Sequence, residues 1–302
     1  MNRKPSIAVL MGGPDNEHDV SIVSGTSVAE ALEAADCGSI IPHKIGRISQ
    51  EELGQLEGDV IFPVLHGPWG EGGPLQEMLE ADGRPFVGCG CTAARAAMDK
   101  HRAKEIAREL GIPTPDWELL RPGQSSKMTP PVVVKPVAEG SSVQVHVTHT
   151  TSQRDAAISQ MPDHDILVEQ FIDGRELTVG ILDDQTLPLI EIKPASGLYD
   201  YEAKYHRDDT VYEVNPDLPM ELASQLNQFS LALSRALGIR HLCRVDFLLD
   251  EHGPWLLEIN TMPGFTSHSL LPMAARAHGL ELPDLCRQLV QMAISSAQGT
   301  VR

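Results

Sequence analysis

The feature that most constrains this chain is an alternation of apolar runs, glycine-rich loops and helical segments over its first ninety residues. An apolar run at 6–11 is followed by a helical segment at 20–35, and a second run at 60–65 leads into the glycine-rich loop 66–74. Strands that alternate with helices usually pair in parallel. The sequence therefore predicts an α/β lobe with a parallel sheet, in which Pro63 makes the second run an edge strand or an irregular one.

Two further groups of elements follow this lobe. A helix over 93–110 is predicted to stop at Gly111, and 121–131 reads as a linker. The expected central elements are strands at 132–135, 144–148 and 166–171 and a helix at 153–160. The expected C-terminal elements are strands at 176–182, 187–193, 243–249 and 255–260, a polar loop at 196–218, a helix at 221–237 and two closing helices. We expect three lobes, at 1–97, 98–176 and 177–302.

The last two predicted strands form a hairpin with an unusual polar face. If its turn centres near His252, Asp246 lies opposite Glu258. Side chains two residues apart share a face, so Arg244 and Asn260 join the two acids. The opposite face is then the core face, with Val245, Phe247, Leu257 and Ile259.

Two carboxylates and an amide oxygen on one sheet face are suitable ligands for Mg²⁺, which takes oxygen ligands from protein and phosphate. Asp246, Glu258 and Asn260 are therefore candidate metal ligands. The alternative is a solvated polar face, which we disfavour because exposed strands are usually richer in Thr, Lys and Ser than in clustered acids.

Three weaker signals accompany the hairpin. Lys135 precedes the small-residue loop 139–142, whose backbone N–H groups could approach a phosphate, although a surface turn explains the same pattern. Glu169 and Glu176 flank a strand end that could bind adenine and ribose, or could form an ordinary hairpin with exposed acids. His66 begins a glycine-rich loop and is either a binding residue or a structural one.

Charge and cysteine content exclude other classes. The formal net charge of −18 argues against a general nucleic-acid binder, which needs a basic face. No apolar run approaches a membrane span, and the N-terminal residues do not resemble a secretory signal. Five scattered cysteines without zinc-like spacing suggest reduced thiols in a cytoplasmic protein.

Several segments together resemble the D-alanine–D-alanine ligase family of the ATP-grasp superfamily. They are MGGPDNEHDVS (11–21), HGPWGEGGPLQ (66–76), MDK (98–100), VVVKPVAEGSSV (132–143), LVEQFIDGRELTV (167–179), YDYEAKY (199–205), CRVDF (243–247) and LLEINTMPGFTSHS (256–269). The resemblance covers nearly the whole chain. It implies an ATP-grasp fold, α/β overall with α+β ATP-binding lobes, behind a Rossmann-like N-terminal lobe.

The resemblance also assigns residues to ATP, to metal and to two D-alanine molecules. The implied ATP contacts are Lys100 and Lys135 at the phosphates, Lys204 on a covering loop, Glu169, Gln170, Phe171 and Ile172 at adenine, and Glu176 at ribose. The implied catalytic residues are Glu17, Ser141, Tyr205, Arg244 and Gly264, where Arg244 and the Gly264 N–H would stabilise an oxyanion. The implied substrate residues are His66, Val20, Ser269 and Leu270, and the metal ligands match Asp246, Glu258 and Asn260.

The activity that the resemblance implies is D-alanyl-D-alanine synthesis for peptidoglycan precursors, through a D-alanyl phosphate, with two Mg²⁺ or Mn²⁺ ions. It further implies a cytoplasmic homodimer that binds neither nucleic acid nor membrane. The chain departs from the family at Gln144, usually Gly, at Gly72, commonly Asp, and in a short 111–132 stretch.

The sequence also allows three alternative interpretations. A relative that uses D-lactate or D-serine is disfavoured by the motif at 199–205, because depsipeptide-forming relatives carry His in place of its tyrosine. His206 directly after Tyr205 leaves a small ambiguity. An ATP-grasp ligase for other amino acids also remains open. A non-catalytic nucleotide-binding protein would normally have lost Arg244 or a metal acid, and both are present.

Overall fold

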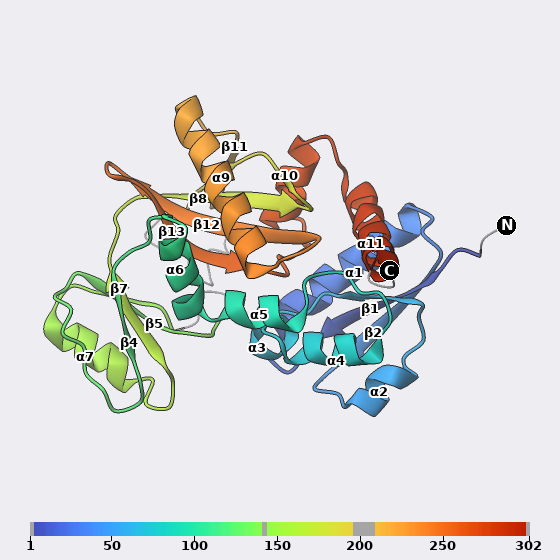
Figure 1. Cartoon of the computed structure of the whole chain (residues 1–302), viewed down its shortest axis with the longest axis horizontal. Coiled ribbons are helices and arrows are strands. Elements are labelled where there is room, and N and C mark those ends of the chain that lie inside the picture. The colour runs from blue at the N-terminus through green and yellow to red at the C-terminus, as the bar shows by residue number, and fades with distance from the viewer. Residues whose placement is uncertain (1–2, 141–143, 196–208, 300–302) are drawn as a thin grey trace.

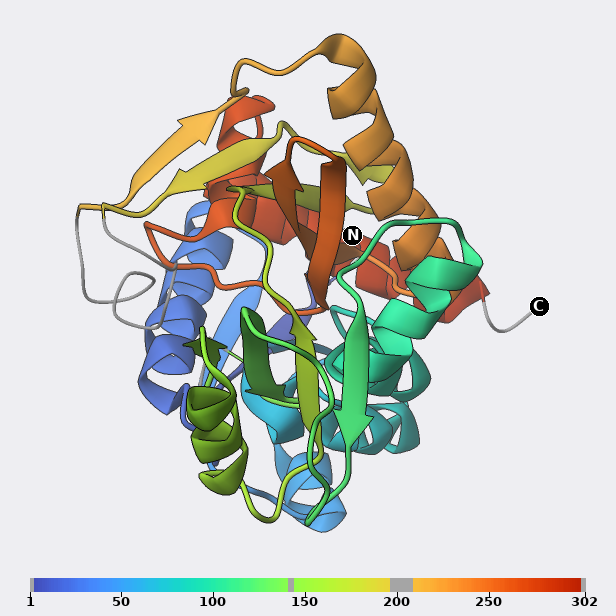
Figure 2. The same cartoon turned by 90° about the vertical axis from the view of Figure 1, so that its left-hand side faces the viewer.

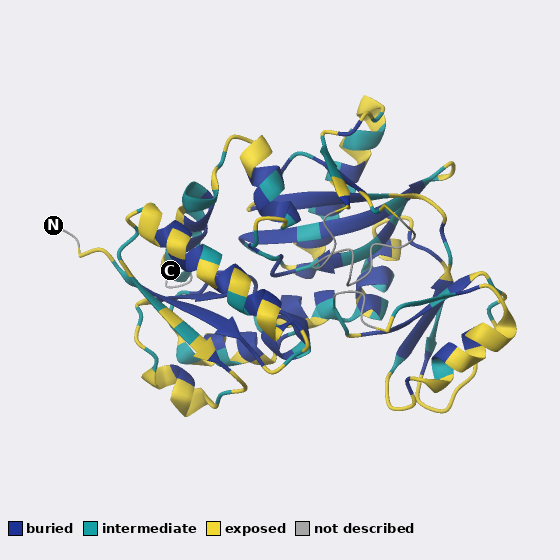
Figure 3. Cartoon of the chain, turned by 180° about the vertical axis from the view of Figure 1, so that it is seen from behind, coloured by how far each residue is buried: buried dark blue, intermediate teal, exposed yellow. Residues whose placement is uncertain are grey.

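The computed structural model describes residues 3–140, 144–195 and 209–299, and these residues form three β-sheets flanked by helices (Figure 1). Each sheet has its own region of the molecule, and the inner strands of the sheets are mostly buried (Figure 3). In the part of the chain that is described, no helix is both long enough and apolar enough to cross a bilayer.

The N-terminal sheet is parallel, as the sequence predicts, and has the strand order β2-β1-β3. The strand β3 is last in this strand order, but the edge position expected from Pro63 is covered, because the Ile61 N–H donates to the Pro85 carbonyl oxygen and the Val87 N–H to the Ile61 carbonyl oxygen. The other edge strand, β2, is absent from the predicted elements because its exposed and half-buried residues do not form an apolar run. The elements of this lobe are β1 (Ser6–Gly12), α1 (His18–Ala34), β2 (Ser39–Ile45), α2 (Gln50–Gln55), β3 (Val60–Pro63), α3 (Gly67–Gly70) and α4 (Pro74–Asp82).

The central sheet is antiparallel, with the strand order β4-β7-β5-β6, and one helix packs against it (Figure 2). Its core is small and consists of residues such as Leu120, Val134 and Val168. The elements are β4 (Trp117–Leu120), β5 (Val132–Pro136), β6 (His146–Thr148), α7 (Thr151–Ser159) and β7 (Ile166–Gln170).

The C-terminal sheet has the strand order β11-β10-β8-β12-β13, with β9 paired to β8. Its strands are β8 (Arg175–Leu182), β9 (Gln185–Thr186), β10 (Ile190–Lys193), β11 (Val211–Val214), β12 (Leu242–Asp250) and β13 (Gly253–Asn260). Its helices are α9 (Met220–Leu237), α10 (Leu270–Ala277) and α11 (Leu282–Gly299).

Two predicted elements are wrong. The single helix expected over 93–110 is two helices, α5 (Cys91–Met98) and α6 (Lys100–Glu109), because Asp99 leaves the helical conformation. The Asp99 side chain accepts a hydrogen bond from the Arg102 N–H and so caps α6. The loop expected over 196–218 contains the strand β11, and 196–208 lies outside the described residues.

The helix α6 links the central residues to the C-terminal sheet. Its Ala103 and Ala107 belong to the same hydrophobic core as Val179 and Val245 of that sheet. The predicted boundary at 97/98 grouped α6 with the central lobe, and the boundary at 176/177 falls inside β8. We therefore propose that the central lobe begins after Ile112, because Ile112 still packs in the same core as α6.

Candidate active site

The hairpin β12–β13 has the predicted pairing, but a β-bulge produces it. Asp246 pairs with Glu258 and Arg244 with Asn260, as expected. The two-residue turn is Glu251-His252, so a regular hairpin would place Asp246 opposite residue 257. The register shifts after Asp246, where Phe247 pairs with Leu256, and the extra residue on β13 restores the Asp246–Glu258 pair.

The bulge also changes which leucine faces the core. Leu256 is 1% exposed and packs in the core of the C-terminal sheet. Leu257, which the alternation placed in the core, instead lines a cavity together with Leu248. The prediction for Leu257 was wrong because one extra residue moves the side chains before it to the opposite face.

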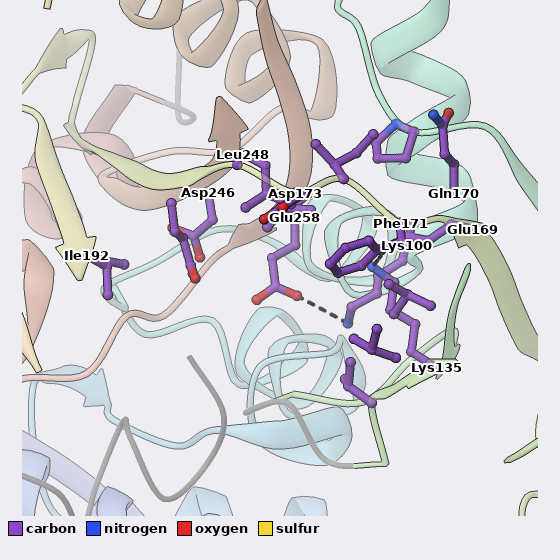
Figure 4. A pocket seen from close by; sticks show the side chains of 18 of the residues that line it. Lys100, Lys135, Glu169, Gln170, Phe171, Asp173, Ile192, Asp246, Leu248 and Glu258 are labelled. Carbon is purple, nitrogen blue, oxygen red and sulfur yellow. Dashed lines mark hydrogen bonds and ion pairs between the residues drawn. The ribbon is translucent and has the colours of Figure 1, made fainter. Parts of the chain in front are cut away.

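This cavity has a volume of about 580 Å³ and lies between the central and C-terminal sheets. The side chains of Lys100 and Lys135 line it from one side and those of Asp246 and Glu258 from the other (Figure 4). The implied nucleotide-binding residues also line it, namely Glu169, Gln170, Phe171, Ile172 and Glu176. Apolar walls with cations and carboxylates at one end can hold a nucleoside base and its phosphates.

Asp246 and Glu258 are held by cationic groups. Arg244 donates two hydrogen bonds of 2.9 Å to Asp246, and the Asn260 amide donates one of 3.0 Å. The Nζ of Lys100 lies 3.4 Å from Glu258 Oε2. Arg244 and Asn260 therefore hold Asp246 from its own sheet face, and Glu258 faces Lys100 across the end of the cavity.

The chemistry of the predicted ligand set fits a hard divalent cation. Asp246 is buried, Glu258 is partly exposed, and Asn260 lies on the same sheet face. Among the described residues, no cluster of three His, Cys, Asp or Glu side chains could hold a metal ion by itself. An ion at this face would therefore combine the two carboxylates with the Asn260 amide oxygen and with ligand oxygens, as Mg²⁺ does.

Glu169 lies between two lysines in the floor of this larger cavity. Lys135 pairs with one of its carboxylate oxygens, and Lys104 pairs with the other at 2.9 Å. Although burial acts to raise it, the two ammonium groups lower the pKa of Glu169 to about 2. The Glu169 side chain is thus engaged inside the protein, so contact with adenine would come from its backbone.

A second cavity of about 70 Å³ adjoins the first, since Gly140 and Glu258 line both. It lies between loops of the N-terminal lobe and the segment that follows β13. Its walls contain the predicted substrate and oxyanion residues, namely Glu17, His66, Arg244, Gly264, Ser269 and Leu270. Val20 is buried on α1, three residues after Glu17. Ser141, Tyr205 and Lys204 lie outside the described residues.

Gly264 is packed closely against α10. A Cβ atom at this position would lie 2.7 Å from Ser269 Oγ. Ser269 precedes α10, and its hydroxyl accepts a 2.9 Å hydrogen bond from the Thr266 N–H. The loop that carries the candidate oxyanion N–H is therefore fixed by local hydrogen bonding.

The sequence prediction missed Glu71, the acid in the glycine-rich loop after His66. Its carboxylate is buried and accepts hydrogen bonds from the Met262 N–H at 3.1 Å and the Gly67 N–H at 3.3 Å. Burial and the neighbouring charge of Glu17 raise the pKa of Glu71 to about 8. The sequence signal that could have identified Glu71 is its position as an acid within the glycine-rich loop 66–74.

His66 lies beside this acid. Its Nδ1 is 3.9 Å from Glu71 Oε1, and burial lowers its pKa despite the opposing effect of Glu17. Its buried Nε2 has no hydrogen-bond partner among the residues that the structure describes. A neutral imidazole with an unsatisfied nitrogen favours a binding role for His66 over a purely structural one.

Two of the three departures from the family pattern, at positions 72 and 144, can be related to the local backbone. At position 72, a Cβ atom would lie 2.4 Å from the Pro68 carbonyl oxygen, so this loop conformation requires glycine. Gln144 has a φ of 55°, in the left-handed region that glycine adopts most readily. The glycine that the family usually has at this position therefore matches the local backbone.

Two α+β lobes that enclose a nucleotide-sized cavity, with lysines facing carboxylates, define an ATP-grasp enzyme. The described fold is similar to a D-alanine–D-alanine ligase from Bacillus anthracis complexed with ATP, with a TM-score of 0.86 and 32% identity over 99% of this chain and 100% of that one. Models of the D-ala D-ala ligase N-terminus and C-terminus match residues 39–89 and 106–291. The chain belongs to the D-alanine–D-alanine ligase family.

Individual relatives agree with this assignment. D-alanine–D-alanine ligase B of Chromobacterium violaceum is 41% identical over 300 residues, which cover 96% of this chain and 98% of the relative. The structure of a D-Ala:D-Ser ligase from Enterococcus faecalis is also similar, with a TM-score of 0.83 and 27% identity over 97% of this chain and 100% of that one. One structural neighbour is thus named for D-serine as its second substrate.

Proposed function

We propose that this chain joins two D-alanine molecules to form D-alanyl-D-alanine for peptidoglycan precursors, with release of ADP and phosphate. The observation that carries this proposal is the junction of the two cavities at Gly140 and Glu258. A nucleotide in the larger cavity can place its terminal phosphate there. A D-alanine carboxylate in the smaller cavity can meet it, which is the geometry that formation of an acyl phosphate requires.

The first half-reaction transfers the γ-phosphoryl group of ATP to the carboxylate of the first D-alanine. Lys100 and Lys135, which line the larger cavity, are assigned to neutralise phosphate charge, and Asp246, Glu258 and Asn260 are the proposed metal ligands. Two Mg²⁺ ions, or Mn²⁺, would supply further charge neutralisation at the phosphates when bound. The backbone of 169–172 is assigned to adenine and Glu176 to ribose.

In the second half-reaction, the amine of the second D-alanine attacks the acyl phosphate carbon, a C–N bond forms, and phosphate leaves. Arg244 and the Gly264 N–H are assigned to the oxyanion that develops on the carbonyl oxygen. Glu17 and His66 are assigned to the first D-alanine, and Val20, Ser269 and Leu270 to the substrate pocket. Ser141, Tyr205 and Lys204 are proposed to cover the site, because water would hydrolyse the acyl phosphate.

We further propose that the enzyme works as a homodimer in the cytoplasm. The support for these two statements is family membership. The five cysteines are free thiols, which is consistent with a reducing compartment.

A phosphate-release assay with several acceptors tests the proposal. With ATP, Mg²⁺ and millimolar D-alanine, we expect phosphate release that depends on the metal. D-serine, D-lactate and L-alanine, each added with D-alanine, measure the second-substrate preference, and mass spectrometry identifies the products. Phosphate release with D-alanine that does not exceed the background rate would refute the assignment. A main product that contains D-serine or D-lactate would refute the choice of second substrate.

A further inference from the structure

Lys104 is a buried lysine for which the proposed mechanism has no role. It lies on α6, one helical turn after Lys100, and is 1% exposed. Its Nζ is 2.9 Å from Glu169 Oε2 and 2.7 Å from Thr114 Oγ1, and it lies 5.1 Å from the centre of the Trp117 ring. Unlike Lys100 and Lys135, it is not among the residues that line the nucleotide cavity.

Glu169 thus has two counter-charges of different kinds. Lys135 lines the cavity and can reach a ligand, whereas Lys104 binds the same carboxylate from within the protein. A buried carboxylate that loses all its cationic partners costs several kcal/mol. If Lys104 were absent, Glu169 would depend on Lys135 alone, and a phosphate would have to compete with Glu169 for that lysine.

We propose that Lys104 is a positioning residue for nucleotide binding: it keeps Glu169 ionised and compensated, so that Lys135 is available to the nucleotide phosphates. The inference rests on the proposed use of the larger cavity for ATP. Lys104 acts through Glu169 and Lys135 and does not itself contact the nucleotide. Lysine suits this position because its three donors match an acid, a hydroxyl group and an aromatic face.

A purely structural role for Lys104 makes a different prediction. Thr114 Oγ1 donates to the Leu256 carbonyl oxygen at 2.9 Å, so the Lys104 contacts also connect the central sheet to β13. If Lys104 only joined the two lobes, its loss would weaken nucleotide binding whether or not residue 169 carries a charge. If it compensates Glu169, its loss matters only while that charge is present.

The pH dependence of binding provides a second readout. The charged groups that face Lys104 are Glu169 on β7, Lys135 on β5 and Arg108 on α6. Burial, opposed by Glu169, lowers the pKa of Lys104 to about 8. Deprotonation above this pH removes the same counter-charge as the Lys104→Met substitution does.

A double-mutant cycle tests the inference, with the dissociation constant of ADP in the presence of Mg²⁺ measured by calorimetry at pH 7 and low temperature. We expect Lys104→Met to weaken ADP binding by at least about tenfold, the scale of one lost charge-assisted hydrogen bond. In a Glu169→Gln background, the same substitution should change the constant less than about threefold. Arg102→Met, an exposed change on the same helix, is the matched control and should leave binding unchanged.

Equal losses in both backgrounds, or no loss in the native background, would overturn the inference. If Lys104→Met does not fold, the pH profile decides: ADP binding should weaken above pH 8 in the native protein and stay flat in Glu169→Gln. A flat profile in the native protein would also overturn it. Failure of the native protein to bind ADP would refute the proposed function itself, so the two failures are distinguishable.

Discussion

Glu169 and Glu71 are both buried glutamates at the walls of the active site, yet their environments favour opposite charge states. Glu169, in the nucleotide cavity, lies between Lys104 and Lys135, and its pKa is lowered to about 2. Glu71, in the smaller cavity, has two backbone N–H partners and the charge of Glu17 nearby, and its pKa is raised to about 8. At neutral pH the first carries a negative charge and the second is mainly protonated.

The difference shows that contact with a cation, rather than depth of burial, decides the charge of these acids. Backbone N–H groups from Gly67 and Met262 only partly offset the desolvation of Glu71. At Glu169, the attraction of two ammonium groups outweighs the effect of desolvation on the pKa. The larger cavity thus has lysines compensated by an ionised acid where the phosphates are proposed to bind, whereas the smaller cavity keeps a neutral acid beside a neutral histidine.

The largest effect should come from removing the acid between the lysines. Glu169→Ala leaves two buried ammonium groups without their carboxylate and should lower the free energy of unfolding by about 3–5 kcal/mol. Urea denaturation at pH 7 measures it. The control is Glu77→Ala, which breaks the exposed pair with Arg95 and should cost less than about 1 kcal/mol. A similar small loss for Glu169→Ala would show that the lysines do not stabilise the ionised form.

The next effect concerns the acid shared by both cavities. Glu258→Gln should lower turnover at least ~100-fold, a scale typical of lost transition-state electrostatics. Phosphate release with D-alanine measures the rate. Glu251→Gln, at the exposed turn of the same hairpin, should retain the native rate. A near-normal rate for Glu258→Gln would remove Glu258 from the metal site.

A smaller effect, on the pH dependence of the free energy of unfolding, is expected from Glu71. Because the folded-state pKa of Glu71 is raised, its stabilising contribution is complete below its unfolded pKa and disappears as pH rises through about 8. The native protein should lose about 1 kcal/mol from this group between pH 7 and 8.5. Glu71→Gln should remove that part of the slope in urea denaturation, whereas exposed Glu77→Gln should keep it. An unchanged slope in Glu71→Gln would contradict the raised pKa.

At low pH, the corresponding loss of stability should come from Glu169. Its lowered folded-state pKa gives a contribution that is present above the unfolded pKa and disappears as pH falls toward about 2. The two glutamates should therefore destabilise the protein at opposite ends of the pH range.

The smallest effect should come from a change in backbone conformation without a change in charge. Gln144→Gly relieves the left-handed φ beside Val145, a residue of the nucleotide cavity, and should stabilise the protein by less than about 1 kcal/mol. Thermal unfolding measures this effect. Gln228→Gly, in the interior of α9, should instead destabilise by about 1 kcal/mol. Destabilisation by Gln144→Gly would show that the glutamine side chain makes a contact that outweighs the strain.

Local patterns in the sequence determined the parts of the molecule that depend on near neighbours along the chain. The parallel N-terminal sheet followed from alternating apolar runs and helices. The faces shared by Arg244 and Asp246 on β12, and by Glu258 and Asn260 on β13, followed from the period of two in a strand. The motifs, taken together, also identified the family.

Only the tertiary structure decided the features that depend on distant residues. The bulge exchanged Leu256 and Leu257 between core and cavity, because register depends on pairing as well as on alternation. The charges of Glu169 and Glu71 depend on desolvation and on partners far away in the chain, such as Lys104 and Met262. Alternation along a strand shows which residues share a face, but the pKa of a buried acid depends on which groups the folded chain packs around it.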